Sequence, residues 1–151
     1  MNILVVSDSH GRTRGLLQAV EHIQPDHLIH LGDGFNDIQR VNAEFPLLTV
    51  TQVPGNCDFF ADCPLEQTFT LGGVKLFACH GHTRGVKSNL QGAYYAAREA
   101  EAQVLLFGHT HYPIHDNLGD LLVVNPGSIG YDGRYAVLEI ADGHVTCNLY
   151  D

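Results

Sequence analysis

Five short segments of the chain carry side chains that bind metal ions. Each combines Asp, Asn or His with a glycine or follows directly on an apolar run. They are Asp8-Ser9-His10, Gly32-Asp33-Gly34, Gly55-Asn56-Cys57-Asp58, His80-Gly81-His82 and Gly108-His109-Thr110-His111. Carboxylate oxygens, amide oxygens and imidazole nitrogens together suit borderline divalent cations. The five segments are therefore predicted to build one metal site.

The candidate ligands are more numerous than one ion needs. They are Asp8, His10, Asp33, Asn56, His80, His109 and His111. Two ions about 3.5–4 Å apart need a shared carboxylate, and such a pair can hold both the attacking and the leaving oxygen of a phosphoryl transfer. Asp33 is alone in its segment, so it is the best candidate for the bridge. We expect two divalent ions, with Mn²⁺ favoured over Ni²⁺, Fe²⁺ and Zn²⁺.

The first three segments follow predicted strands. Apolar runs at 2–6, 27–31 and 47–53 are typical of buried strands, and apolar spacing at 14–23 and 35–41 predicts helices between them. Strands that alternate with helices form a mostly parallel sheet, and ligands bind beyond the carboxyl ends of such strands. Asp8, Asp33 and Asn56 are all expected at that edge.

The second half of the chain is richer in strands. A Gly-Gly pair at 72–73 predicts a hairpin between 67–71 and 74–79, and helical spacing follows at 90–97. Further strands are predicted at 104–107, 114–117, 121–124, 135–140 and 145–150. So many strands in so short a chain indicate an α/β fold of two packed mixed sheets with helices on the outer faces. We expect a single domain over residues 1–151.

Composition and charge limit the classes of function. The chain has 17 acidic and 8 basic residues and a formal net charge of −9, so broad nucleic-acid binding is not expected. The sequence has no apolar stretch long enough for a signal peptide or a membrane span. The four cysteines show no C-x-x-C pair or zinc-finger spacing, which favours reduced thiols and a cytoplasmic protein.

The order of the motifs resembles that of the calcineurin-like metallophosphoesterase family. The shared pattern is Asp-x-His, Gly-Asp, Gly-Asn, a later His and Gly-His-x-His, from Asp8 to His111. The short length, the His80-Gly81-His82 segment and the stretch at 125–128 look most like the small YfcE-type phosphodiesterase branch. This resemblance implies a four-layer α/β/β/α sandwich and a metal-dependent phosphodiesterase that acts on a small phosphate ester.

The resemblance also implies a role for each candidate ligand. One set, Asp8, His10, Asp33 and His111, would hold the first ion. The other set, Asp33, Asn56, His80 and His109, would hold the second ion. Two cations would lower the pKa of a bridging water, giving a hydroxide that attacks phosphorus. Backbone N–H groups at 81–82 and 125–128 are expected to help neutralise the phosphoryl oxygens.

Cys57 departs from the pattern of the wider family. Many members of the wider family that the chain resembles have His directly after the motif asparagine, where it protonates the leaving group. A neutral thiol is a poorer proton donor than a histidine. General-acid catalysis typically raises the reaction rate by about 10²–10⁴. Asp58 and His82 are the two other candidates for the proton donor. His82 is also a candidate for contact with the substrate phosphate. The sequence therefore favours diesters and activated aryl esters over alkyl monoesters.

Two other functions are compatible with the same motifs. A retromer scaffold subunit resembles this branch, so the chain could be a non-catalytic protein-interaction platform. A metal-dependent nucleotide-binding protein is the other alternative. Phe35, Phe59, Phe60 and Tyr131 suggest an aromatic rim that could stack on a nucleobase. The oligomeric state is expected to be a monomer or a homodimer.

Overall fold

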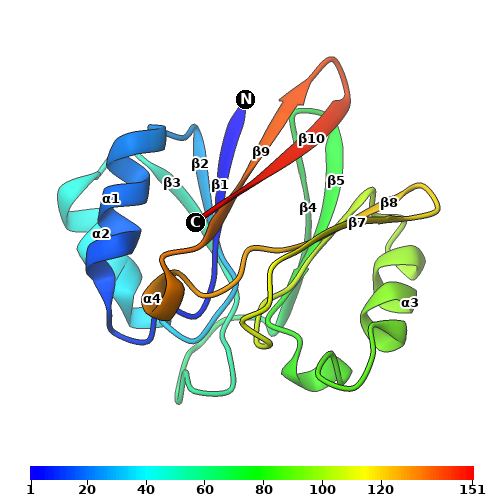
Figure 1. The fold of residues 1–151 in the computed structure, drawn as a ribbon, viewed down its shortest axis with the longest axis horizontal. Helices are drawn as coiled ribbons and strands as arrows, with labels where there is room; N and C mark the ends of the chain where they lie inside the picture. The colour runs from blue at the N-terminus through cyan, green and yellow to red at the C-terminus, as the bar shows by residue number, and fades with distance from the viewer.

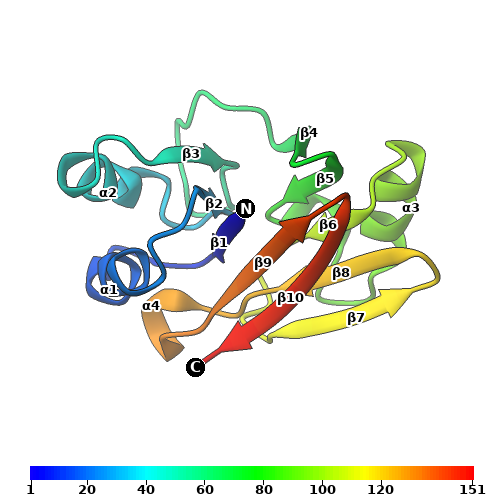
Figure 2. The same cartoon turned by 90° about the horizontal axis from the view of Figure 1, so that it is seen from above.

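Two five-stranded mixed sheets pack face to face, and helices cover their outer faces (Figure 1). The computed structural model describes residues 1–151. Figure 2 shows the layers side by side, with α1 and α2 on one side of the sheets and α3 on the other. The predicted four-layer α/β/β/α sandwich is therefore confirmed.

The first sheet is parallel at its centre and antiparallel at one edge. Its order is β10-β9-β1-β2-β3, with β1, β2 and β3 parallel to one another. Its strands are β1 (Asn2–Val6), β2 (His27–His30), β3 (Thr49–Gln52), β9 (Tyr135–Ala141) and β10 (His144–Tyr150). The helices of this half are α1 (Thr13–Ile23), η1 (Phe35–Asp37), α2 (Ile38–Glu44) and α4 (Ile129–Asp132).

The second sheet has the order β4-β5-β6-β8-β7 and is parallel from β5 to β8. Its strands are β4 (Glu66–Leu71), β5 (Val74–Cys79), β6 (Val104–Leu106), β7 (Ile114–Leu118) and β8 (Leu121–Asn125). The helices of this half are η2 (His82–Arg84) and α3 (Gln91–Glu99). No helix in the structure has the length and apolar character needed to cross a membrane.

Both faces of the inner strands are buried, which explains their almost uninterrupted apolar sequence. Ile3 of β1 and Leu76 of β5 belong to the cluster between the sheets. The next residue of β1, Leu4, points to the opposite face and packs with Leu16 of α1. Full burial of one such side chain stabilises the fold by about 1.5–3 kcal/mol. The strand is therefore fixed from both sides, and so is the loop that follows it.

The predicted elements are found with small differences at their ends. The strand expected at 47–53 covers only Thr49–Gln52, because Leu47 is 97% exposed and lies outside the sheet. The sequence pattern predicted neither η2 nor α4. These elements have three and four residues, too few to show a helical period.

Candidate metal centre

The five predicted segments meet at one place in the structure. They follow the carboxyl ends of β1, β2, β3, β5 and β6. Their ligand atoms form three groups, within each of which the atoms lie no more than 4.8 Å apart. The groups are Asp8 with His10 and His111, His10 with Asp33 and Cys57, and Asp33 with His80 and His109. The second group shares a member with each of the others, so the groups form one continuous cluster.

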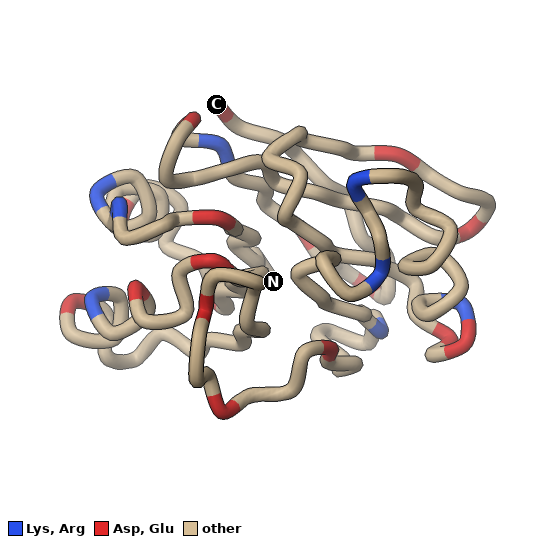
Figure 3. The backbone as a smooth tube through the Cα atoms, turned by 90° about the horizontal axis from the view of Figure 1, so that it is seen from below, with Lys and Arg blue, Asp and Glu red and all other residues tan.

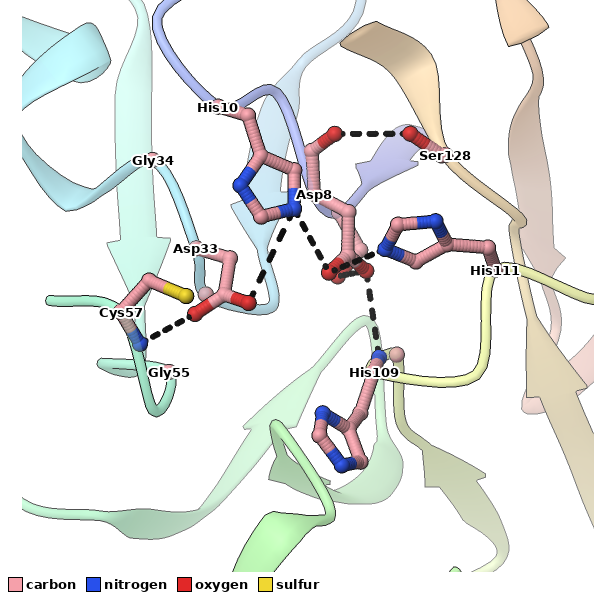
Figure 4. Close-up of polar contacts among 12 residues, drawn as sticks. Asp8, His10, Asp33, Gly34, Gly55, Cys57, His109, His111 and Ser128 are labelled. Atoms are coloured by element: carbon pink, nitrogen blue, oxygen red, sulfur yellow. Dashed lines mark hydrogen bonds and ion pairs between the residues drawn. The ribbon is translucent and has the colours of Figure 1, made fainter. Parts of the chain in front are cut away.

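Asp8 has one carboxylate oxygen anchored in the protein and one facing the cluster (Figure 4). Its Oδ2 accepts hydrogen bonds from the Ser7 hydroxyl at 2.7 Å and the His109 backbone N–H at 3.1 Å. Its Oδ1 lies 3.2 Å from His111 Nε2 and 3.6 Å from His10 Nε2. The anchored oxygen orients the carboxylate, and the other oxygen is directed toward the imidazole nitrogens.

Asp33 is arranged in the same way between two histidines. Its Oδ1 accepts a hydrogen bond from the Cys57 backbone N–H at 2.8 Å. Its Oδ2 lies 3.3 Å from His80 Nε2 and 3.8 Å from His10 Nε2. Burial raises the pKa of Asp33, but the hydrogen bond and charge of His80 and the Cys57 N–H outweigh it and hold that pKa well below its usual value.

His80 is buried and has its ring fixed in one orientation. Its Nδ1 lies 2.6 Å from the Leu31 carbonyl oxygen, so Nδ1 carries the proton and donates it there. Nε2 then faces Asn56 Oδ1 at 3.0 Å, as well as the oxygens of Asp33 and Asp8. Burial lowers the pKa of His80, but these carboxylates outweigh it and raise that pKa. A nitrogen surrounded by acceptor oxygens needs positive charge at this point, either a second proton on the ring or a bound metal ion.

The backbone of the cluster is unusual. Nine residues other than glycine have positive φ angles, and five of them are the candidate ligands Asp8, His10, Asp33, His109 and His111. Asp, Asn and His tolerate the left-handed region better than other side chains do, but each such residue still costs on the order of 1 kcal/mol. The cost of this conformation is concentrated where side chains from neighbouring residues must converge.

Two glycines allow the loops to approach closely enough. A Cβ atom on Gly55 would lie 2.2 Å from Asp33 Oδ1, and one on Gly108 would lie 2.0 Å from Ser7 Oγ. Either contact would displace a group that orients a candidate carboxylate. The glycines in these motifs are therefore required by the packing around the ligands.

The remaining predicted site residues also lie at the cluster. Asn56 contacts His80 through its side-chain oxygen. The ring of His82 lies 5.4 Å from that of His80, and its Nδ1 is buried without a hydrogen-bond partner. Burial, followed by the charge of His80, lowers the pKa of His82. These contacts agree with the expected positions, and the chemical roles remain predictions.

Asp58 has a different environment from the one expected of a proton donor. Its two carboxylate oxygens accept hydrogen bonds from the backbone N–H groups of residues 33, 34, 35 and 55, with N···O distances of 2.7–3.0 Å. These bonds tie the loop after β2 to the loop after β3. The geometry thus gives Asp58 a positioning function, and its proton-donor role is left as an untested expectation.

Cys57 was not predicted as a ligand. Its thiol is exposed, and its sulfur belongs to the group formed with His10 and Asp33. Burial, and then the charge of Asp33, raise the pKa of this thiol. The sequence placed Cys57 beside the ligands but gave no sign that its sulfur faces them, because that depends on how the loops fold together.

The segment at 125–128 supports the site from behind. The Ser128 hydroxyl donates to the Asp8 carbonyl oxygen at 2.8 Å, and the Gly127 N–H donates to Asn125 Oδ1. The Gly127 N–H expected to meet phosphate is therefore used inside the protein. This segment fixes the loop that carries Asp8, a role that the sequence did not reveal.

His30, at the end of β2, is fully buried. Its Nδ1 accepts the Gly32 N–H at 3.1 Å, so the proton of the neutral ring is on Nε2, 2.9 Å from Ser9 Oγ. The Ser9 hydroxyl in turn donates to Asp37 at 2.6 Å. Burial lowers the pKa of His30 to about 4. A proton on Nδ1 would break the bond to Gly32.

We expect His30 to make the protein less stable in acid. The unfolded chain binds a proton at this histidine near pH 6.5, whereas the folded protein binds it only near pH 4. Between these values the unfolded state holds more protons, so the free energy of unfolding falls as the pH is lowered, by at most about 3 kcal/mol. Urea unfolding of wild type and His30→Gln from pH 6.5 to 4, with a chelator present, measures the difference.

The control for this measurement is His144→Gln, because His144 is exposed on β10. The His30→Gln variant should show a smaller decline than wild type, and the His144→Gln variant the same decline. Equal declines in all three proteins would mean that His30 does not contribute to the acid sensitivity.

Comparison with known proteins places the chain among phosphoesterases. Residues 1–143 match the calcineurin-like phosphoesterase superfamily domain. A relative from Bacillus subtilis, named probable metallophosphoesterase YsnB, is 35% identical over 159 residues, which cover 100% of this chain and 91% of that protein. The phosphodiesterase YfcE of Escherichia coli is 28% identical, with 92% of this chain and 88% of the relative covered.

Solved structures give the same fold. A predicted phosphoesterase from Streptococcus pneumoniae has a TM-score of 0.80 and 32% identity, and the match covers 98% of this chain and 87% of the other. Vps29 of Chaetomium thermophilum also has a TM-score of 0.80, at 17% identity, with 99% and 94% covered. At that identity the second likeness concerns the fold alone.

Proposed function

Since the chain belongs to the calcineurin-like phosphoesterase superfamily, we propose that it is a phosphodiesterase with two divalent metal ions. Phosphoesterase activity is supported by the family match and by the relatives named metallophosphoesterase. The diesterase activity is supported by the likeness to YfcE, which carries that name. We also propose that residues 1–151 form one domain, because both sheets contribute to one buried cluster.

The observation that carries the proposal is the environment of His80 Nε2. This nitrogen faces three oxygens, and the other ring nitrogen is already bonded to Leu31. His10 Nε2 is likewise buried without a hydrogen-bond partner, although two carboxylates are nearby. Donor atoms of this kind fit a divalent cation. A site built only for packing would pair each acceptor with an N–H or O–H group.

The ligands divide between the two ions according to their contacts. Asp8, His10 and His111 would hold the first ion, and His80, His109 and Asn56 would hold the second. Asp33 Oδ2 lies between His10 and His80, which makes it the proposed bridge. Burial and the charges of His80 and Lys87 lower the pKa of His109, which favours the neutral form that binds metals.

When bound, two divalent ions would activate water as a nucleophile and neutralise charge on the phosphoryl oxygens. The protein's part is to hold the carboxylates and imidazoles in fixed orientations, through their bonds to Ser7, Leu31 and Cys57. His82 is placed to contact the phosphate, since its Nδ1 is buried without a partner beside His80. Mn²⁺ is the proposed ion, with Ni²⁺, Fe²⁺ and Zn²⁺ as alternatives.

The sequence motifs are also compatible with two alternative functions. The likeness in fold to Vps29 keeps open a protein-interaction scaffold without catalysis. The complete cluster of seven candidate ligands favours the enzyme, because a scaffold does not need it. A metal-dependent nucleotide-binding protein would bind its ligand at equilibrium without turning it over.

We expect the purified protein to bind two Mn²⁺ ions per chain and to hydrolyse bis(p-nitrophenyl) phosphate. Chelation should abolish hydrolysis, because the ligands alone supply neither the nucleophile nor the charge. Metal analysis after reconstitution gives the stoichiometry, and release of p-nitrophenol gives the rate. The same protein reconstituted with Mg²⁺ is the matched control, since Mg²⁺ prefers oxygen ligands and should support less turnover.

Two results would contradict this proposal. One ion or fewer at saturating Mn²⁺ would show that the second site is not built as proposed. Two bound ions without turnover of any aryl diester would favour the scaffold or the nucleotide-binding protein. Isothermal titration with a nucleoside monophosphate would then separate these two alternatives.

A further inference from the structure

A cavity of about 720 Å³ opens beside the candidate metal ligands. His10, Asp33 and Cys57 belong both to its lining and to the candidate ligand cluster. Four aromatic side chains also line it, namely Phe35, Phe59, Phe60 and Tyr131. The volume is within the range of cavities that hold small organic ligands. The cavity therefore continues from the place where a phosphate would bind to a surface made largely of aromatic rings.

The aromatic residues are not accounted for by packing in the core. Phe59 and Phe60 are 78% and 103% exposed, and Tyr131 is 51% exposed. Phe60 also has a φ of 64°, which is unfavourable for a bulky side chain. Two adjacent phenylalanines left in solvent beside a cavity are best explained by a ligand that covers them.

Tyr131 gives the cavity a fixed wall next to the metal ligands. Its ring lies 5.1 Å from that of His10 and stacks with that of His111 at 5.6 Å. The guanidinium of Arg12 lies over the same ring at 4.6 Å. A ring held on several sides keeps one orientation, so Tyr131 forms a rigid side of the cavity next to the metal ligands.

The charge around the cavity restricts the part of the ligand that it accepts. Asp37, Asp58 and Asp62 belong to its lining, and no Lys or Arg does. Figure 3 views the backbone from below, the side of the site loops, and shows acidic residues along them. A second anionic group in this cavity would meet like charge. The group that enters it should be neutral or positively charged.

We propose that this cavity binds a flat heteroaromatic ring of the substrate, such as a nucleobase, while the phosphate is held at the metal ligands. The inference rests on the proposed function and adds the substrate class: a phosphodiester with an uncharged or cationic nucleoside as one ester group. Aromatic side chains stack on the faces of bases without strong sequence preference. The two exposed phenylalanines provide such surfaces, and Tyr131 forms the side of the cavity next to the metal ligands.

The test compares two ligands that differ only in the base. Adenosine 5′-monophosphate and ribose 5-phosphate are titrated by calorimetry into Mn²⁺-loaded protein. We expect the nucleotide to bind about 5- to 150-fold more tightly, the range for stacking on one base. The double variant with Phe59→Ala and Phe60→Ala should lose most of this ratio and leave the affinity for ribose 5-phosphate unchanged. Tyr95→Ala, an exposed aromatic on α3, is the matched control and should keep the ratio.

A second comparison tests the charge. Uridine 5′-monophosphate should bind at least about 5-fold more tightly than its 5-carboxy derivative, because the added carboxylate meets like charge. Asp62→Asn should reduce that difference, since Asp62 is the exposed carboxylate of the lining. Equal binding of the two uridine nucleotides to wild type would overturn the charge argument.

The outcomes also separate this inference from the proposed function. Equal affinities for the nucleotide and ribose 5-phosphate, or an unchanged ratio in the double phenylalanine variant, would overturn the inference. An unchanged ratio in that variant would fit a role of the exposed phenylalanines in docking a protein. Hydrolysis of bis(p-nitrophenyl) phosphate is measured in the same preparations. Tighter binding of the nucleotide without any hydrolysis would contradict the proposed function and support the inference that the cavity binds a base.

Discussion

Replacing Asp33 with alanine is expected to lower the occupancy of both metal sites together and to reduce diester hydrolysis by at least about 100-fold. Loss of a residue that only supports a ligand already costs about 10- to 100-fold. Asp33 has a larger role, because its Oδ2 lies between His80 at 3.3 Å and His10 at 3.8 Å. Metal analysis and kcat/KM for bis(p-nitrophenyl) phosphate, both at a fixed Mn²⁺ concentration, measure the two effects.

The matched variants for this experiment are Asp33→Asn and His10→Ala. Asparagine keeps an oxygen for the Cys57 N–H, so it separates loss of the negative charge from disturbance of the loop. His10→Ala removes a contact of the first site only and should weaken that ion more than the other. If Asp33→Ala released one ion and left the other at full occupancy, Asp33 would not be a bridge.

Much of the fold could be predicted because its signals are local. The run at 2–6 is apolar at every central position, and the structure buries both of its faces. The spacing at 14–23 similarly predicts α1. Glycine-rich segments after these elements marked the loops. The positions of Asp8 and Asp33 at strand ends followed from the alternation of strands and helices.

What the sequence did not reveal depends on contacts between distant segments. Asp58 was one of two candidates for the proton donor, and the sequence did not show that its oxygens bind N–H groups from the loop at 33–35, 23 to 25 residues earlier in the chain. Ser128 supports Asp8 across 120 residues. No local pattern encodes either pairing. They arise only when loops from different strands meet at one edge.

We expect Cys57 to occupy the position that a general acid has in the wider family. It is exposed, it lines the cavity, and its sulfur lies close to the ligand atoms of His10 and Asp33. A thiol whose pKa is raised by burial and by Asp33 is a poor proton donor to an alkoxide leaving group at neutral pH. We therefore expect wild type to prefer aryl diesters to alkyl monoesters, because p-nitrophenolate leaves without a proton.

Cys57→His should increase kcat/KM for an alkyl monoester such as glycerol 3-phosphate by about 10²–10⁴, the usual range for general-acid help. The rate for bis(p-nitrophenyl) phosphate should change little. Cys57 is outside the set of residues with positive φ, and its bond to Asp33 comes from the backbone, so the substitution leaves that contact in place. The gain should decline as the pH rises through the imidazole pKa, near 6.5 for an unperturbed histidine, because only the protonated ring donates.

Cys57→Asn is the matched control, since its amide resembles imidazole in polarity but does not titrate. It should leave the alkyl monoester rate at the wild-type level. Metal content is measured in all three proteins, because the Cys57 sulfur lies with His10 and Asp33 and an imidazole there could itself bind an ion. If wild type already hydrolysed glycerol 3-phosphate as fast as the aryl diester, another residue would supply the proton. His82, beside His80, would then be the first to replace, because its ring lies at the cluster and both Asp58 oxygens are bonded to backbone N–H groups.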